Sequence, residues 1–162
     1  MRIFSGSVDV SDVSKTLERI NAAADACGST VVVIDAGRCA GRAHIESAVL
    51  HAKRSFAAGE NVARSLAMEI LVYVSGQRQC SLAAKFGLHS GKNEVFAVIL
   101  DGDEARAEEM LCGIISPCEV SAPVPERLME LFDITEAELS VVGRDRIWEL
   151  VLERTAMVDA WK

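Results

Sequence analysis

The chain has 162 residues, of which 50% are hydrophobic and 25% are charged, and its net charge is −7. This composition excludes a disordered chain and is typical of one soluble globular domain covering residues 1–162. No apolar run reaches the ~20 residues of a membrane span and no leader pattern opens the chain, so we expect a cytoplasmic protein with no membrane partner. The five cysteines lack a C-x-x-C pair, so we expect free thiols and no metal site.

Basic residues are concentrated in one part of the sequence. Residues 36–92 contain eight lysines and arginines against three acidic residues, a net charge of +5, whereas residues 93–162 have a net charge of −10. The asymmetry indicates a local basic surface for an anionic partner, provided that the fold keeps these residues together.

The first part of the chain alternates strands and helices. A strand is predicted at residues 3–8, followed by a helix that Asp9 or Ser11 caps and that ends near residue 27. The β-branched segment 30–35 has the continuous apolar character of a buried strand.

The glycine-bearing loop at residues 35–42 follows this strand and precedes a helix. That layout is shared with phosphate-binding loops, but the G-x-G-x-x-G and Gly-Lys-Ser/Thr patterns are missing. A small-ligand or nucleotide-binding enzyme using this loop is therefore the alternative hypothesis for function.

Two histidines lie on the next predicted helix, at residues 43–57. His44 and His51 are seven residues apart and are expected on a second face, away from the apolar one. Without an acid or cysteine nearby they make a poor metal site, and we expect a structural or RNA-facing role.

The central predicted helix, residues 61–75 with Asn61 as its cap, is apolar on all sides. Such a helix belongs in the interior of a domain. Glu69 in its middle must reach an edge or pair with a cation, for which Arg78 is the candidate. The helix ends in a Gly-Gln-Arg-Gln turn at residues 76–79, which presents two amides and one guanidinium where the core meets solvent.

The rest of the chain is predicted to add further helices and two strands. The expected elements are a short helix at 79–86, a strand at 95–100, a helix at 103–111 capped by Asp103, a strand at 118–120, helices at 125–132 and after the capping box Thr135-x-x-Glu138, and a last helix at 145–161. Together they predict an α+β fold with a small mixed four-stranded sheet packed by several helices.

The last helix carries two apolar stripes. Packing on one core requires only the first stripe, which consists of Ile147, Leu150, Val151, Val158 and Trp161. The second stripe consists of Trp148, Leu152 and Ala156, and it either meets another protein or is buried as well.

Catalytic patterns are missing from the sequence. No serine occupies a G-x-S-x-G elbow, and the acidic residues follow the spacing of solvated helix faces. We therefore expect a binding module with no catalytic residues and no cofactor.

Three sequence blocks resemble one known family. The blocks are M-E-I-L-x-Y-x-S-G-Q-R-Q at residues 68–79, H-x-x-x-A-x-x-H-A at 44–52 and E-R-x-A-M-V at 153–158. They resemble the kinase-binding subunit of the KEOPS complex, known in animals as the PRPK-binding protein, and the resemblance covers essentially the whole chain.

The resemblance implies a non-catalytic partner of the small atypical kinase/ATPase subunit of KEOPS, bound on the N-terminal lobe of that kinase. The family's complex makes the threonylcarbamoyl group on the adenosine next to the anticodon of ANN-decoding tRNAs, and this subunit captures tRNA through its 3′ CCA end. We expect tRNA contacts from Gly76, Gln77, Arg78 and Gln79, with a phosphate-binding rim of Lys53, Arg54, Arg64 and Lys85. The second stripe, Trp148, Leu152 and Ala156, is expected to form part of the kinase interface.

Overall fold

The computed structural model describes residues 1–161, which form two compact units. One unit, here called the sheet unit, comprises residues 1–35 and 87–121. The other, the helical unit, comprises residues 36–86 and the chain from residue 122 onward. An α+β fold with one four-stranded sheet confirms the predicted fold class.

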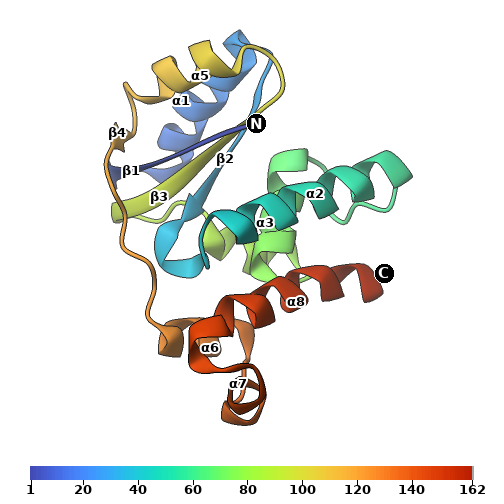
Figure 1. Ribbon diagram of the computed structural model, residues 1–162. Helices are drawn as coiled ribbons and strands as arrows, with labels where there is room; N and C mark the ends of the chain where they lie inside the picture. Colours follow the sequence, from blue (N-terminus) through green and yellow to red (C-terminus); the bar gives the residue numbers. More distant parts are fainter. Residues whose placement is uncertain (162) are drawn as a thin grey trace. The chain divides into compact units, whose positions relative to one another are not determined.

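The sheet has the strand order β2-β3-β1-β4, with β1 at Arg2–Val10, β2 at Thr30–Asp35, β3 at Gly91–Leu100 and β4 at Ser116–Pro117 (Figure 1). Every neighbouring pair is antiparallel. The prediction of a mixed sheet is therefore wrong. The reason is topological: β3 lies between β1 and β2, and therefore separates the two strands that the first β-α-β segment would otherwise place side by side in parallel. β1 and β3 pair from Arg2–Ile99 to Val10–Gly91, which extends both strands beyond their predicted bounds.

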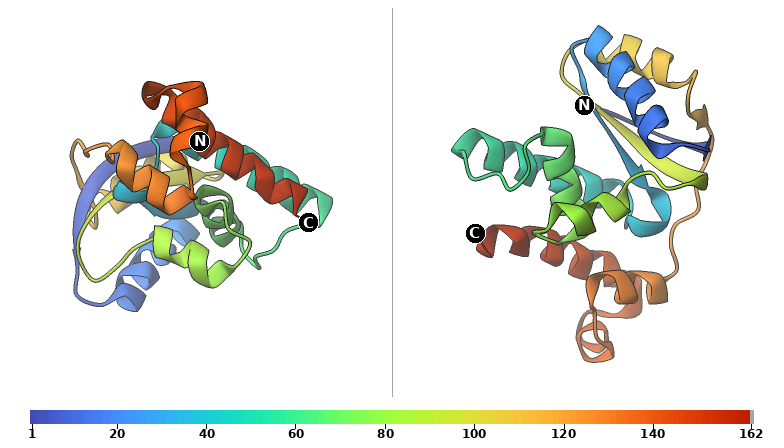
Figure 2. Two further views of the ribbon diagram at one scale, coloured as in Figure 1. Left: turned by 90° about the horizontal axis from the view of Figure 1, so that it is seen from below. Right: turned by 180° about the vertical axis from the view of Figure 1, so that it is seen from behind.

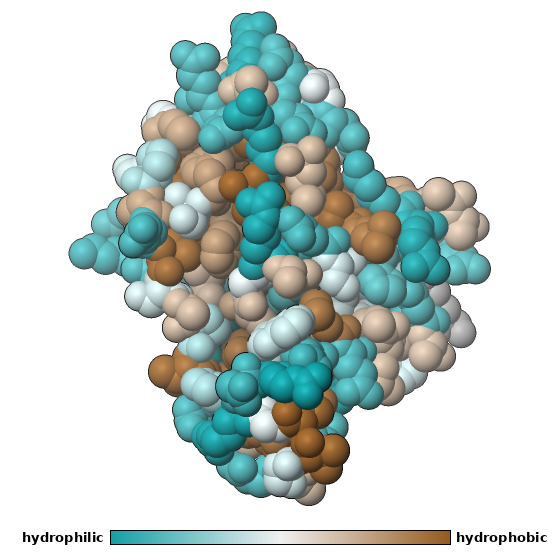
Figure 3. All heavy atoms as spheres, viewed as in Figure 1, coloured by the Kyte–Doolittle hydropathy of each residue, from teal (hydrophilic) through white to brown (hydrophobic). Residues whose placement is uncertain are grey.

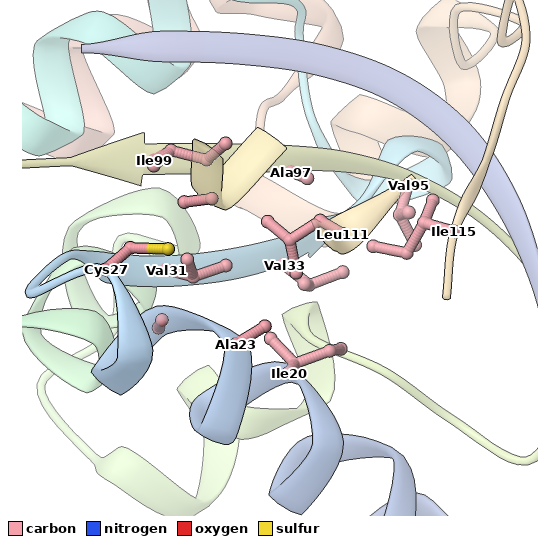
Figure 4. Packing of buried hydrophobic residues seen from close by; sticks show 12 residues of the cluster. Ile20, Ala23, Cys27, Val31, Val33, Val95, Ala97, Ile99, Leu111 and Ile115 are labelled. Atoms are coloured by element: carbon pink, nitrogen blue, oxygen red, sulfur yellow. The ribbon is translucent and has the colours of Figure 1, made fainter. Parts of the chain in front are cut away.

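Two helices complete the sheet unit: α1 at Val13–Ala26 and α5 at Glu104–Leu111. The cap of α1 is Asp12 rather than Asp9 or Ser11, because β1 continues to Val10. Asp103 caps α5 as predicted. An apolar cluster joins α1 and α5 to alternate residues of β2 and β3 (Figure 4). The cluster consists of Ile20, Ala23, Ala24, Cys27, Val31, Val33, Val95, Ala97, Ile99, Ala107, Leu111 and Ile115.

The fourth strand is shorter than predicted and lies two residues earlier. It pairs with β1 only at Gly6–Pro117 and Ser7–Ser116, although the Cys118 N–H still donates to the Ser5 carbonyl at 3.1 Å. A Cβ at position 6 would lie 2.6 Å from the Ser116 oxygen, so only glycine permits this close approach of the two backbones.

The helical unit is built around α2 (Arg42–Ala58), α3 (Leu66–Ser75) and α8 (Ile147–Ala160). Each of these three helices packs against the other two (Figures 1 and 2). The end of α2 lies against the first part of α3, since Ser55 near the end of α2 bonds to Glu69 in α3. The smaller helices are α4 (Cys80–Ala83), α6 (Pro125–Phe132) and α7 (Glu136–Val142), with 3-10 turns at Ala36–Arg38, Ala84–Phe86 and Arg144–Arg146.

Several helix boundaries agree with the sequence. Pro125 begins α6 and Phe132 ends it, and the predicted capping box of Thr135 and Glu138 begins α7. In the part of the chain that the structure describes, no helix combines the length and the apolar character that crossing a bilayer requires.

Candidate functional site

The Gly-Gln-Arg-Gln turn stands at the end of a helix that is buried on all sides, as predicted. Residues 69–75 of α3 are all buried, and Gly76 ends the helix with φ +63°, a left-handed conformation that favours glycine. The side chains of Gln77, Arg78 and Gln79 are exposed, and within residues 1–161 none of the three has a hydrogen-bond or ion-pair partner. The turn therefore offers two amides and one guanidinium to an external ligand.

Close packing brings this turn against α8. A Cβ at Gly76 would lie 3.4 Å from Arg154 Cβ, so two of the sequence blocks, 68–79 and 153–158, meet at this point. A hollow of about 490 Å³ lies beside them. Its lining consists of Ser75, Gly76, Gln77, Phe132, Asp133, Glu138, Glu153, Arg154, Met157 and Trp161.

The Arg154 side chain, which lines this hollow, has a structural role. Its Nε donates to the Phe132 carbonyl at 3.1 Å, and its Nη2 donates to the Asp133 carbonyl at 3.2 Å and to Glu138 Oε1 at 2.6 Å. Hydrogen bonding from the Thr135 backbone, followed by that from Arg154, lowers the pKa of Glu138 to about 2. Arg154 thus ties α8 to the junction of α6 and α7, and its guanidinium is already engaged.

Glu69 is fully buried and is not paired with Arg78, so that prediction is wrong. Its Oε1 accepts from Ser55 Oγ at 3.0 Å, and its Oε2 accepts the backbone N–H groups of Val62 at 3.0 Å and Ala63 at 2.7 Å. Backbone amides of the loop before α3 therefore satisfy the carboxylate in place of a cation.

These hydrogen bonds also explain why α3 begins later than predicted. The loop amides turn toward Glu69, and the helix starts at Leu66 with Ser65 as its cap. Asn61, the predicted cap, instead donates from Nδ2 to the Ala63 carbonyl at 2.8 Å.

His44 is buried, not on a second face as predicted. Its Nδ1 accepts the Ala40 N–H at 3.1 Å, and its ring meets Phe132 edge-on with centroids 5.5 Å apart. Burial lowers the pKa of His44 to about 4, a shift that the backbone of Val74 opposes in part. His44 therefore supports the loop at residues 39–41 as a neutral ring.

His51 belongs to a cluster that sequence reasoning missed. Its Nδ1 lies 2.5 Å from Asp159 Oδ2, and its ring stacks on Tyr73 with centroids 5.5 Å apart. The Tyr73 hydroxyl donates to Asp159 Oδ1 at 2.5 Å. The cluster links α2, α3 and α8.

The predicted phosphate-binding rim is exposed, but two of its members, Arg54 and Arg64, lie away from the turn. Lys53, Arg54, Arg64 and Lys85 are all exposed. Arg54 and Arg64 lie near the start of α3, since their neighbours Ser55 and Ala63 both bond to Glu69. The Gln77–Gln79 turn lies at the other end of α3, about 15 Å away for a ten-residue helix. The basic segment is thus divided between the two ends of α3.

The second stripe of α8 is not buried, which excludes the alternative that both stripes pack inside the chain. Trp148 is 43% exposed, Leu152 is half-buried and Ala156 is exposed. The first stripe is buried through Val158 but not at Trp161, which is 45% exposed. Other apolar atoms are open to solvent on the face shown in Figure 3, including some over α7, where Val141 is 85% exposed.

The loop at residues 35–42 does not form a phosphate cradle. Ala36 and Cys39 are buried, the Cys39 N–H donates to the Ala36 carbonyl at 3.4 Å, and the Ala40 N–H donates to His44. Two backbone amides that a phosphate would need are therefore already engaged, one within the loop and one by a side chain of α2. Across residues 1–161 there is also no cluster of three or more histidine, cysteine or acidic side chains that could hold a metal ion.

Comparison with known proteins identifies the family. No curated protein matches the chain. A family model described as kinase binding protein CGI-121 matches residues 8–159, which confirms the resemblance to the KEOPS kinase-binding subunit that the three sequence blocks indicate. The chain therefore belongs to the CGI-121 family of kinase-binding proteins.

Proposed function

We propose that this protein is the non-catalytic accessory subunit of a cytoplasmic KEOPS complex, which modifies tRNA with threonylcarbamoyl groups. In this role it binds the N-terminal lobe of the small atypical kinase/ATPase subunit and captures tRNA through the 3′ CCA end. The kinase part of the proposal is supported by membership of a kinase-binding family.

The observation that carries the RNA part is the exposed turn at residues 77–79. An arginine between two glutamines, none engaged elsewhere in the described chain, can bond both to phosphates and to the edges of unpaired bases. Arg54 and Arg64 provide further exposed cations at the other end of α3, and an extended single strand of several nucleotides would reach from one end to the other.

A titration with full tRNA and with tRNA lacking its 3′ CCA, each at two salt concentrations, tests this proposal. We expect salt-sensitive binding that is lost with the CCA. Equal binding of both RNAs would contradict capture of the CCA end. No binding of either RNA would leave the kinase interface as the proposed role.

The two partners should be separable by mutation. Arg78→Ala is expected to weaken tRNA binding and leave kinase binding intact, because Arg78 has no structural partner in the described chain. Arg19→Ala, which removes an exposed cation from α1 in the sheet unit, is the matched control and should leave both activities unchanged. Equal loss of both activities in Arg78→Ala would indicate a structural role for Arg78.

The kinase interface is proposed to include Trp148, Leu152 and Ala156, because a half-exposed tryptophan on an open apolar stripe is typical of a protein interface. Trp148→Ala should weaken kinase binding and spare tRNA binding. Val141→Ala, which shortens an even more exposed apolar side chain on α7, is the control. Equal effects of the two substitutions would contradict a specific role for the stripe.

A further inference from the structure

A buried carboxylate shapes the loop that carries Arg64. Glu69 has 0% exposure, and its Oε2 accepts two consecutive backbone N–H groups, those of Val62 and Ala63. Ser55 on α2 donates the third hydrogen bond, to Oε1. Arg64 follows Ala63 directly and is exposed.

An apolar side chain could fill the same space in the core, but it could not accept these hydrogen bonds. Burying a carboxylate is costly unless its oxygens are hydrogen-bonded, and here two of the three donors are amides of the loop. The Asn61 side chain holds the same loop by donating to the Ala63 carbonyl. The loop backbone is therefore held in one shape before any ligand arrives.

We propose that Glu69 is a positioning residue for RNA binding: it holds the loop so that the exposed Arg64 side chain is already positioned to contact a phosphate. This inference rests on the proposed function, in which Arg64 belongs to the phosphate-binding rim. Its physical basis is preorganisation, since a loop that is already ordered loses less conformational freedom when RNA binds. Glu69 touches no RNA itself and acts through Val62 and Ala63.

The test is the salt dependence of tRNA affinity in the full chain. Each phosphate contact to a single strand contributes about 0.7 to the slope of log affinity against log salt concentration. Arg64→Ala should make the slope shallower, reducing its magnitude by about that amount. Glu69→Ala should reduce the magnitude of the slope equally. The double variant should show no further reduction.

Glu69→Gln is the conservative variant. Its amide oxygen still accepts from the Val62 and Ala63 amides, and its NH₂ group can donate to Ser55 Oγ, so the slope should remain at the wild-type value. Urea unfolding measured on every variant reports whether the protein is folded, and kinase binding is measured separately. Should Glu69→Ala fail to fold, Asn61→Ala loosens the loop without leaving buried donors unpaired, and it should lower the slope in the same direction.

An affinity loss in Glu69→Ala without a change of slope would overturn the inference, as would an equal loss of kinase binding in a folded variant. An unchanged slope in Asn61→Ala would overturn it as well when that variant alone is folded. Wild-type binding whose slope does not respond to Arg64→Ala would refute this inference only. The absence of any tRNA binding by the wild-type protein would refute the proposed function.

Discussion

The sheet unit and the helical unit bury polar groups differently. The sheet unit has a continuous apolar cluster, and its buried polar side chains, Thr16, Ser29 and Asn93, carry no charge. Among its buried side chains the helical unit has a histidine and a glutamate, His44 and Glu69, each hydrogen-bonded to the backbone of an irregular loop. A sheet ladder satisfies its own backbone, whereas a loop against a helix needs side-chain partners. All the candidate contact residues lie in the helical unit, where those loops are.

The largest expected effect is on the apolar cluster. Leu111→Ala empties a fully buried position in the sheet unit and should lower the free energy of unfolding by about 2–5 kcal/mol. Urea unfolding measures this loss. The tRNA affinity of the folded variant should stay unchanged, because no candidate RNA contact belongs to the sheet unit. An altered affinity would mean that the division of roles between the units is wrong.

The pH dependence of stability should reflect His44. Its pKa is 6.5 as a free side chain and about 4 in the fold, so the unfolded chain takes up a proton first as the pH falls. Stability is therefore full above pH 6.5 and decreases between pH 6.5 and 4, by up to about 3 kcal/mol. Chemical denaturation at a series of pH values measures this decrease.

Two variants test whether His44 causes this decrease of stability. His44→Gln should flatten the decrease, because the amide does not titrate and its oxygen can accept the Ala40 N–H. His89→Gln in the sheet unit is the control, since the His89 side chain is 53% exposed, and it should retain the wild-type profile. A wild-type profile in His44→Gln would contradict the assignment to His44.

A smaller effect is expected from the cluster that links α2, α3 and α8. Tyr73→Phe removes the hydrogen bond from the buried hydroxyl to Asp159 and should cost about 2 kcal/mol. Thr155→Val removes a neutral 3.3 Å hydrogen bond within α8 and should cost less. Thermal or urea unfolding compares them. The reverse order would show that the contact with Asp159 contributes little.

The smallest expected effect is the loss of a helix cap, and it should be equal in the two units. Asp103→Ala and Thr135→Ala each remove a helix cap, one in the sheet unit and one in the helical unit, and each should cost about 1 kcal/mol. Urea unfolding of both variants measures the two losses in free energy of unfolding, which should agree. A clear difference between them would mean that local capping depends on the unit.

Much of the fold follows from local patterns. Strand β2, helix α6, the Asp103 cap and the Thr135 capping box were predicted because each depends on a few neighbouring residues. The all-antiparallel pairing was missed, since it depends on β3 entering between two strands that are close in sequence. The start of α3 was missed because Glu69 competes for the amides of Val62 and Ala63.

The candidate site divides in the same way. The exposed Gln77–Gln79 turn after a buried helix could be read from the abrupt change from apolar to polar residues. The partners of Glu69 and His51 could not, because Ser55 and Asp159 are 14 and 108 residues away from them in the chain.

By itself the sequence determined the elements, the buried central helix and, through three short blocks, the family. Only the tertiary structure decided that Arg154 and Glu69 are engaged internally, that Arg78 is free of structural bonds in the described chain, and that the basic residues divide between the two ends of α3. The physical reason is that helical periodicity and capping act over a few residues, whereas the satisfaction of a buried charge depends on whichever distant backbone the fold brings to it.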